Sequence, residues 1–390
     1  MDPNIELLLE LIPVPGESTK ESEISAKIRA VLSDMGVPDD CMCNDDAYKQ
    51  SEYGGNTGNL VVRLDGHGKG ERRMLSTHMD TVPGCIGSRP AVRDGRIVNE
   101  AEDRALGGDA RAGCACLLAA ARAIMERKGD HPPWTFVFFV QEELGLVGSR
   151  GMDPKNLGTP VPAMCFNFDG GEANELANAV IGTERLNINI TGVAAHASRP
   201  HLGISAAVIL AEALAELQRD GWNCRIDRPE GQGSANLGIL RGGKGSNVVM
   251  PELYALAEAR SFDREFRSRI VEAWKDAIQR SVERNNERGT DAGGSASVEF
   301  SPGPVYDPYR LPEETPVVRA AVAAMAQCGL KPWLFDHVGG LDCNNIVAKG
   351  IPAVGLGMGD REAHSVKEWV DLEQFTKACE LAVALALGSE

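Results

Sequence analysis

A set of acidic and histidine side chains stands where apolar stretches of the sequence give way to loops. Its members are His78, Asp80, Asp109, Glu142, Glu143, Asp169 and His364. Three of the stretches that precede them, residues 73–77, 134–140 and 164–168, read as strands. Ligands of open α/β sheets bind just beyond the carboxyl ends of the strands, so these groups are expected at one edge of a sheet. Several carboxylates and two imidazoles together favour a hard or borderline metal ion.

In two of the motifs, neighbouring residues could have different roles. His78 precedes Asp80 by two residues, and a carboxylate placed there can accept the second N–H of a metal-ligating imidazole. Of the adjacent pair Glu142 and Glu143, one can bind a metal while the other accepts a proton. Each motif alone also has a plain structural alternative. His78 and Asp80 could be a surface histidine beside a turn. Glu142 and Glu143 could form a solvated acidic turn, and Asp109 could cap a helix.

Composition limits the classes of function. At 390 residues the chain exceeds the size at which single cores usually stop growing, so two domains are expected. The net charge of −16 argues against a nucleic-acid partner, and no apolar run is long enough to span a membrane. The N-terminus lacks the features of a signal peptide. The ten cysteines show no disulfide spacing, so we expect reduced packing residues and a cytoplasmic location.

The order of the expected elements predicts an interrupted α/β domain. Residues 60–64 and 73–77 are expected to pair as strands, and residues 113–127 to form a helix. Ser18 and Glu21 resemble a capping box at the start of a helix.

Around residue 183 the pattern changes. Alternating residues 186–190, a helix, two strands, a second helix and a strand near residue 300 give a βαββαβ order, which is ferredoxin-like. We therefore predict one domain from residues 1–182 and 301–390, with residues 183–300 inserted as a second domain.

The ordered motifs resemble the M20 family of dinuclear zinc peptidases. They are His78-x-Asp80, Gly108-Asp109, Glu142-Glu143, Asp169 and Ala363-His364-Ser365. The inserted segment adds Gly192-Val193-Ala194-Ala195-His196-Ala197, Asn247-Val248-Val249 and Glu258-Ala259-Arg260-Ser261. Within the family, residues 75–83, 140–149 and 257–261 most resemble the peptidase T-like branch of tripeptide aminopeptidases. The resemblance implies an α/β fold: a mixed-sheet catalytic domain with helices on both faces, plus an inserted ferredoxin-like α+β lid.

The resemblance also implies a ligand set. Asp109 would bridge two Zn²⁺ ions, with His78 and Asp169 on one ion and Glu143 and His364 on the other. Co²⁺ or Mn²⁺ can substitute for zinc at such ligands. Asp80 would orient His78, and Glu142 would be the general base toward the water between the ions. A cis peptide bond after Asp109 is a further expectation from the family.

The resemblance also implies residues that contact the substrate, of which His196, Asn247 and Arg260 lie in the lid. His196 would donate to the oxyanion of the reaction, within its own subunit or on a neighbour's site, while Asn247, Arg260 and Gly340 would bind substrate. A homodimer through the lid domain is compatible with the family.

The sequence departs from the peptidase T-like pattern at two points. Ala110-Arg111 follows Asp109 where that branch has a second acid and a lysine, and Arg199 stands in the histidine loop. If Arg199 faces the site, it would favour an acidic substrate group. The favoured function is an aminopeptidase on di- and tripeptides. The alternatives are an N-acyl-amino-acid deacylase or carboxypeptidase of the same family and, less favoured, a non-catalytic binding protein.

Overall fold

The chain forms two compact units in a computed structural model that describes residues 2–388. Unit 1 comprises the chain up to Val180 and again from Arg310, and unit 2 comprises Ile181–Tyr309. The predicted insert comprised residues 183–300, whereas unit 2 also includes residues 181–182 and 301–309. None of the described helices combines the length and the apolar composition that a membrane crossing requires.

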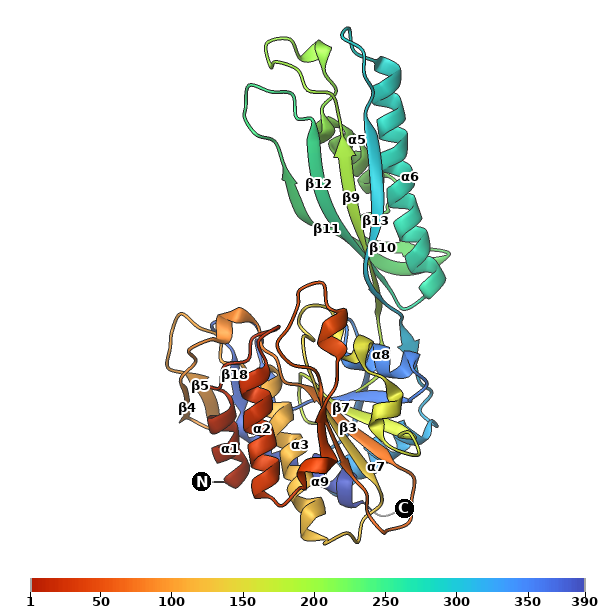
Figure 1. Cartoon of the computed structure of the whole chain (residues 1–390). Helices are drawn as coiled ribbons and strands as arrows, with labels where there is room; N and C mark the ends of the chain where they lie inside the picture. The colour runs from red at the N-terminus through yellow and green to blue at the C-terminus, as the bar shows by residue number, and fades with distance from the viewer. Residues whose placement is uncertain (1, 389–390) are drawn as a thin grey trace. The chain divides into compact units, whose positions relative to one another are not determined.

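Unit 1 is built on a nine-stranded mixed sheet, of which β3 and β7 are labelled in Figure 1. The order along the sheet is β1-β2-β6-β3-β7-β16-β8-β14, and β15 also pairs with β8. The strands are β1 Met42–Asn44, β2 Leu60–Leu64, β3 Arg73–His78, β6 Trp134–Phe139, β7 Met164–Phe168, β8 Glu175–Val180, β14 Tyr309–Arg310, β15 Trp333–His337 and β16 Ala353–Leu356. A smaller four-stranded sheet has the order β17-β18-β5-β4 and consists of β4 Pro90–Arg93, β5 Arg96–Asn99, β17 Asp360–Arg361 and β18 Trp369–Asp371.

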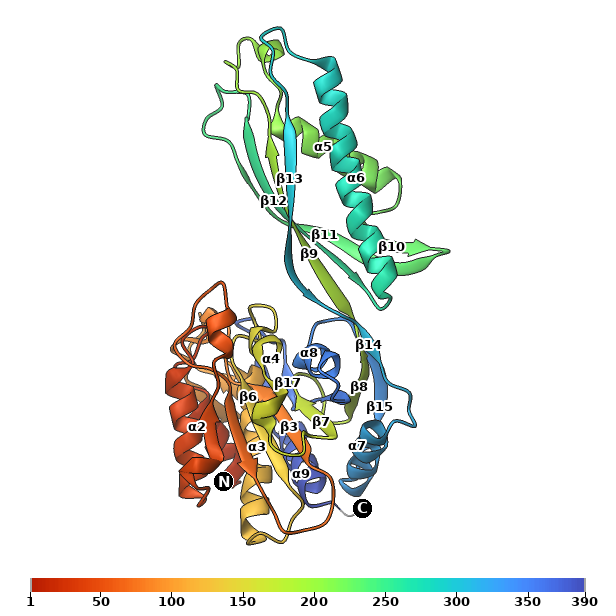
Figure 2. The ribbon, with the colours of Figure 1, turned by 45° about the vertical axis from the view of Figure 1, so that its right-hand side comes forward.

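Helices cover both faces of the large sheet, as predicted. The helices of unit 1 are α1 Pro3–Leu11, α2 Ser22–Asp34, α3 Gly108–Glu126, α4 Val147–Gly151, α7 Pro316–Gln327, α8 Asp342–Ala348 and α9 Leu372–Leu387. Phe136 and Phe138 of β6 belong to one core with α1, α2, α3, α7 and α9. Val137 and Phe139 point to the opposite face and are equally buried. On that face α8 packs on β7 and β16 and contacts α4 (Figure 2).

The close approach of α3 to the sheet explains one glycine. A Cβ atom on Gly113 would lie 2.2 Å from Oγ1 of Thr77 and 2.9 Å from the backbone oxygen of Phe168. Any larger residue would therefore push α3 away from the ends of β3 and β7. This contact fixes the first turn of α3, which carries Asp109, against the strands that carry the other candidate residues.

One predicted pairing is wrong. Strands β2 and β3 are not neighbours, because β6 lies between them, antiparallel to β2 and parallel to β3. Parallel strands joined by a helix normally lie side by side, and α3 supplies that crossover between β3 and β6. The glycine-rich segment between β2 and β3 therefore does not form a hairpin turn.

Unit 2 is an antiparallel sheet with its helices packed into one shared core. The sheet order is β10-β11-β12-β9-β13. Its elements are β9 Gly182–Thr191, α5 Ala206–Arg219, β10 Cys224–Arg228, β11 Gly231–Gly242, β12 Glu252–Ser261, α6 Arg264–Arg288 and β13 Ser297–Tyr306. The core combines Ile188 of β9 and Ala255 of β12 with Ile209 of α5 and Trp274 of α6. Figure 2 shows α5 and α6 beside the strands of this unit.

The predicted βαββαβ pattern is present with one strand added. Without β10, the strands follow the order fourth, first, third, second, which is the ferredoxin-like arrangement. Strand β10 was missed; it pairs with β11 at the edge, from Cys224 opposite Ala235 to Arg228 opposite Gly231. Its residues are mostly exposed and charged, so they lack the apolar alternation that marks a half-buried strand.

Candidate metal centre

Three parallel strands deliver candidate residues to one edge of the large sheet. His78 is the last residue of β3, and Asp169 directly follows the last residue of β7. Glu142 and Glu143 come shortly after β6, beyond Gln141, whose φ of 52° turns the chain there. Strand β3 pairs in parallel with both β6 and β7, so their carboxyl ends meet at the same edge.

Asp109 reaches this edge from the start of α3. The first residues of α3 depart from helical geometry at Asp109 and Ala110, and the peptide bond between them is cis, as the family resemblance implied. A buried carboxylate holds this turn: Glu368 accepts hydrogen bonds from the backbone N–H groups of Gly107 at 2.9 Å and Asp109 at 3.1 Å. Glu368 lies four residues after His364, so one loop both supplies a candidate ligand and fixes the backbone of another.

The five predicted ligands converge. Nε2 of His78 lies 3.0 Å from Oδ1 of Asp109 and 3.7 Å from Oδ1 of Asp169. Nε2 of His364 lies 3.3 Å from Oδ2 of Asp109 and 2.7 Å from Oε1 of Glu143. The two oxygens of Asp109 thus face one histidine each. Potential ligand atoms fall within 4.8 Å of one another in three groups: His78, Asp109 and Asp169; Asp109, Glu143 and His364; and His78, Glu142 and Glu143.

The chemistry of this donor set fits two cations that share Asp109. Imidazole nitrogens and carboxylate oxygens are ligands that Zn²⁺ accepts. Oδ2 of Asp169 is buried and has no hydrogen-bond partner in the described chain. A buried carboxylate oxygen without a donor is costly unless a charge compensates it.

The clustered carboxylates raise the pKa values of both histidines. Although burial opposes a positive charge, hydrogen bonds with Asp109, Asp169 and Asp80 raise the pKa of His78 well above its usual value. Hydrogen bonds with Asp109 and Glu143 raise the pKa of His364 to about 10. Without a cation, the carboxylates therefore hold protons on both imidazoles. A metal ligand must be deprotonated, so cation binding would displace those protons.

For Glu142, the favourable charge of His78 is outweighed by burial and by the neighbouring acids. Burial, with the charge of Asp169 adding to it, raises the pKa of Glu142 well above the usual value. A carboxyl group with a raised pKa is suited to accept and return a proton near neutral pH.

Asp80 supports the backbone of the acidic pair as well as facing His78. Its Oδ1 lies 3.4 Å from Nδ1 of His78 and accepts the N–H of Glu142 at 3.0 Å. Its Oδ2 accepts the N–H of Glu143 at 3.3 Å and the hydroxyl of Ser18 at 2.6 Å. Asp80 is fully buried. One carboxylate therefore fixes the relative positions of β3, the Glu142–Glu143 loop and the N-terminal segment.

The predicted capping role of Ser18 and Glu21 is wrong, because both side chains serve the site. Helix α2 begins at Ser22, and the side chain of Glu21 makes no capping hydrogen bond to it. Glu21 is fully buried and accepts the N–H groups of Thr19 at 2.9 Å and Gln141 at 3.0 Å. Burial raises the pKa of Glu21 to about 7, and the nearby charge of Asp80 adds to the effect. The S-x-x-E spacing drew attention to Ser18 and Glu21. It could not show that their side chains would contact Asp80 and the backbone of Gln141.

The lid candidates all lie in unit 2, and the fold brings two of them together. Nδ1 of His196 contacts the Ser198 hydroxyl at 2.8 Å, and Asn247 accepts the N–H of Ala197 at 2.9 Å through its backbone oxygen. Arg260 lies near the far end of β12 and pairs through Nε with Glu258 at 2.6 Å. It is therefore separated from the His196 and Asn247 loops by most of a strand. Gly340, in unit 1, lies in the loop between β15 and α8.

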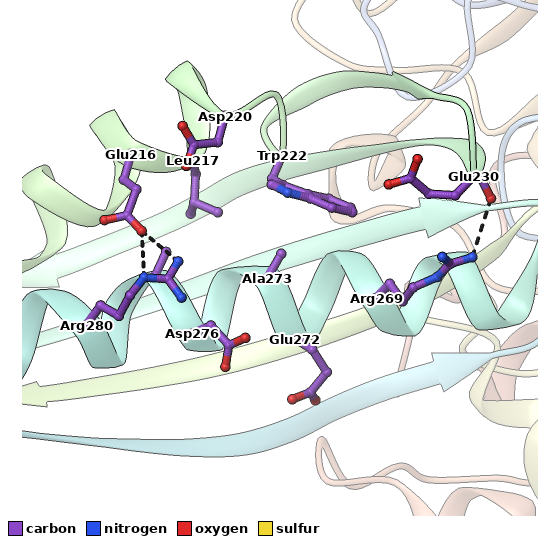
Figure 3. Close-up of a pocket in the computed structure, with 11 residues that line it drawn as sticks. Glu216, Leu217, Asp220, Trp222, Glu230, Arg269, Glu272, Ala273, Asp276 and Arg280 are labelled. Carbon is purple, nitrogen blue, oxygen red and sulfur yellow. Dashed lines mark hydrogen bonds and ion pairs between the residues drawn. The ribbon is translucent and has the colours of Figure 1, made fainter.

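A second concentration of acids, in unit 2, has an ordinary explanation. Figure 3 shows a hollow between α5 and α6 that is lined by Glu216, Glu230, Glu272, Asp276 and other residues. Glu216 pairs with Arg280 at 2.6 Å, and Arg269 donates to the backbone oxygen of Glu230 at 3.4 Å. Among residues 2–388, the clusters suited to a metal lie at the edge of unit 1 and not here. This hollow is a solvated, ion-paired surface.

Comparison with known proteins gives concordant similarities. A sequence model described as "Peptidase family M20/M25/M40" matches residues 74–388. The uncharacterized protein YqjE of Bacillus subtilis is 30% identical over 382 residues, covering 98% of this chain and 96% of YqjE.

Two solved structures superpose over nearly the whole chain. The aminopeptidase PepT of Bacillus cereus has a TM-score of 0.82 at 30% identity, with 98% of this chain and 97% of that chain covered. A tripeptidase of Staphylococcus aureus has a TM-score of 0.84 at 27% identity, with 98% of each chain covered. The predicted resemblance to the peptidase T-like branch is confirmed.

Proposed function

The chain belongs to the peptidase family M20/M25/M40, and from that premise we propose that it is a metal-dependent aminopeptidase acting on di- and tripeptides. The observation that carries the proposal is the pair of ligand groups that share Asp109, with Glu142 beside them. The similarity to an aminopeptidase and a tripeptidase over almost the full length supports the same reaction.

The proposed roles follow the two groups. His78 and Asp169 would hold one cation, Glu143 and His364 the other, and Asp109 both. Two divalent cations, when bound, supply Lewis acidity to the scissile carbonyl and lower the pKa of a water. Glu142 would take a proton from the attacking water and return it to the leaving amine. Asp80 would hold the His78 ring and the backbone of Glu142 and Glu143 in fixed positions relative to each other.

The metal is proposed to be Zn²⁺, two ions per subunit, with Co²⁺ or Mn²⁺ able to replace it. Mixed histidine and carboxylate ligands suit all three ions. Elemental analysis of the purified protein, followed by chelation and titration with each metal, would measure the stoichiometry. A single ion at saturation would contradict the shared role of Asp109.

The substrate-facing roles of unit 2 are also proposals. His196 would donate to the oxyanion, while Asn247 and Arg260, with Gly340 of unit 1, would bind substrate. The separation of Arg260 from His196 within unit 2 implies that the two contact different parts of the ligand or act on different subunits. A homodimer through the lid domain would make the second arrangement available, and light scattering with a variant in the β13 edge would test it.

A second candidate, an N-acyl-amino-acid deacylase or carboxypeptidase, is favoured by the residues after Asp109. Ala110 and Arg111 replace the acid and lysine of the peptidase T-like pattern. Arg111 is buried and donates to the backbone oxygen of Val14 at 3.2 Å. No acidic side chain immediately after Asp109 is therefore available to a free peptide amine.

A metal-replete hydrolysis screen would separate the candidates. Tripeptides, N-acetyl amino acids and blocked peptides would be incubated with the protein, and the products identified by mass. Release of the N-terminal residue from tripeptides supports the aminopeptidase. Release of acetate supports the deacylase, and no turnover of any amide by the metal-loaded protein would contradict both. A cytoplasmic location and the absence of a nucleic-acid partner stay predictions.

A further inference from the structure

A small hollow adjoins the candidate metal centre within unit 1. It has a volume of about 150 Å³ and is lined by Asp169, Gly170, Gly171, Glu175, Ala177, Phe335, His337, Leu341 and the segment Gly355, Leu356 and Gly357. Asp169 is a member of the first ligand group as well as a wall of the hollow. A group bound near the cations can therefore extend into it without leaving unit 1.

Part of the hollow is lined by residues with little or no side chain, Ala177, Gly355 and Gly357, at which other atoms pack closely. Ala177 of β8 pairs with Gly355 of β16. A Cβ atom on Gly355 would lie 2.8 Å from Cδ1 of Leu341, and one on Gly357 would lie 1.9 Å from the backbone oxygen of Glu172. A cavity of this size can hold a group as large as benzene, which is about the bulk of one amino-acid side chain.

One wall of the hollow is aromatic. Phe335 pairs with Ala177 across the parallel strands β15 and β8, and its ring lies 5.8 Å from that of His337 on the same face. Leu341 and Leu356 add aliphatic surface. Such a wall suits the methylene groups of a long, unbranched side chain.

The rim of the hollow carries a second acid, Glu175. Burial raises the pKa of Glu175, while a hydrogen bond from the backbone of Glu172 and the charges of Arg361 and His337 oppose that rise. Arg361 pairs directly with Glu172. Gly171 allows the Glu175 carboxylate to lie against its α-carbon, because a Cβ there would be 2.0 Å from Oε2.

We propose that this hollow is a specificity subsite for a linear cationic side chain, of the lysine type, on the peptide substrate. The methylenes would pack on Phe335 and Leu341, and the ammonium group would pair with Glu175. The inference rests on the proposed function and deepens it by naming a substrate class. Glu175 would bind substrate and take no part in the proton transfer.

The test compares three tripeptides that differ only in the first residue: lysine, norleucine or glutamate followed by two glycines. A second series carries the same residues in the middle position. We expect Glu175→Gln to lower the lysine-to-norleucine ratio of kcat/KM about tenfold in one series, since a charge-assisted contact is worth roughly that factor. Glu175→Asp should keep part of the preference. Phe335→Ala should lower kcat/KM for both the lysine and the norleucine peptides.

The matched control is Asp336→Asn, which removes one negative charge from β15, the strand that pairs with the β8 strand of Glu175. Asp336 pairs with Arg310 at 2.8 Å and 2.6 Å, outside the hollow. An Asp336→Asn variant that lowers the ratio as much as Glu175→Gln would overturn the assignment to a local contact.

Binding keeps the inference independent of turnover. Calorimetry with metal-loaded Glu142→Ala protein would measure the affinity of each tripeptide, with and without Glu175→Gln. If Glu175→Gln weakens the binding of the lysine peptide but not of the norleucine peptide, the result supports the subsite even if no peptide is cleaved. Equal affinities for lysine and norleucine peptides would overturn it, even if the protein proves to be an efficient aminopeptidase.

Discussion

The edge of the unit 1 sheet and the loops of unit 2 present their candidate residues in opposite ways. At the edge, His78 and Asp80 are buried, and each faces other members of the site at short distances. In unit 2, His196 and Asn247 are exposed; His196 contacts Ser198, and the backbone of Asn247 accepts a hydrogen bond from Ala197 of the same unit. In the first region, contacts within unit 1 hold the candidate residues in place. In the second region, the candidate side chains face solvent and no candidate ligand group lies beside them in the described part of unit 2.

This difference separates two kinds of contribution. Buried carboxylates around two imidazoles store electrostatic repulsion that a cation relieves, so unit 1 should bind metal by itself. Exposed donors gain little until water is excluded from them. Variants of the candidate ligands and of Glu142 in unit 1 should therefore change metal binding or proton transfer. Variants of His196, Asn247 and Arg260 in unit 2 should change substrate binding or kcat and leave the bound metal unchanged.

The largest effect is expected from Glu142→Ala. Loss of the general base should lower kcat by about 10²–10⁴-fold, while metal content by elemental analysis stays at the wild-type level. Glu143→Ala is the matched contrast, because Glu143 belongs to a ligand group with Asp109 and His364. It should lose bound metal as well. Equal metal content in both variants would contradict the division of roles between the two adjacent acids.

The lid histidine should come next. His196→Ala should lower kcat by about 10²–10³-fold, the usual effect of removing one oxyanion donor, with the bound metal unchanged. His201→Ala is the control, since His201 is also exposed in the same loop region and lies 4.0 Å from Asp291. If both variants lose activity equally, the loop matters as a whole and His196 has no special part.

A smaller effect should follow from Ser18→Ala. The variant removes the hydroxyl that donates to Asp80 at 2.6 Å, and loss of such outer contacts typically costs about 10–100-fold in activity or metal affinity. We expect the lower end of that range, because the N–H groups of Glu142 and Glu143 still hold Asp80. Steady-state kinetics and a chelator competition would measure the change. Ser22→Ala, on an exposed neighbour, should have no effect.

The smallest effect on activity is expected from Glu21→Gln, whose consequence lies in stability. The pKa of Glu21 is raised in the folded state to about 7 from its usual 4.5, so the folded state binds this proton more tightly than the unfolded state. The associated stability is complete below pH 4.5 and is lost as pH rises to about 7. In metal-free protein, urea unfolding should show a steeper loss over this window for the wild type than for Glu21→Gln. Identical profiles would show that Glu21 does not titrate there.

Local order along the chain was enough to predict much of the candidate site. Each of His78, Glu142 and Asp169 follows an apolar run that the structure shows as β3, β6 or β7, and parallel strands end at a common edge. The alternation in residues 186–190 likewise indicated β9, because a half-buried strand must alternate. The missed strand β10 has no such pattern, since most of its residues are exposed.

Pairings between distant segments could not be predicted in the same way. The sequence suggested that β2 and β3 pair, but β6 separates them, because the crossover through α3 places β6 beside β3. The S-x-x-E spacing suggested a helix cap, yet Ser18 and Glu21 meet Asp80 and the backbone of Gln141.

The amino-acid sequence by itself determined which side chains end the strands and what chemistry they offer, and its change of pattern near residue 183 predicted an inserted domain. Tertiary structure alone decided which groups hold these side chains and their backbone in place: Ser18 on Asp80, Glu21 on Gln141 and Glu368 on the turn before Asp109. The physical reason is that periodicity and spacing act over a few residues, whereas a hydrogen bond such as that between Glu368 and Gly107 joins segments 261 residues apart. Such contacts form only when the packing of the whole unit brings the two segments together.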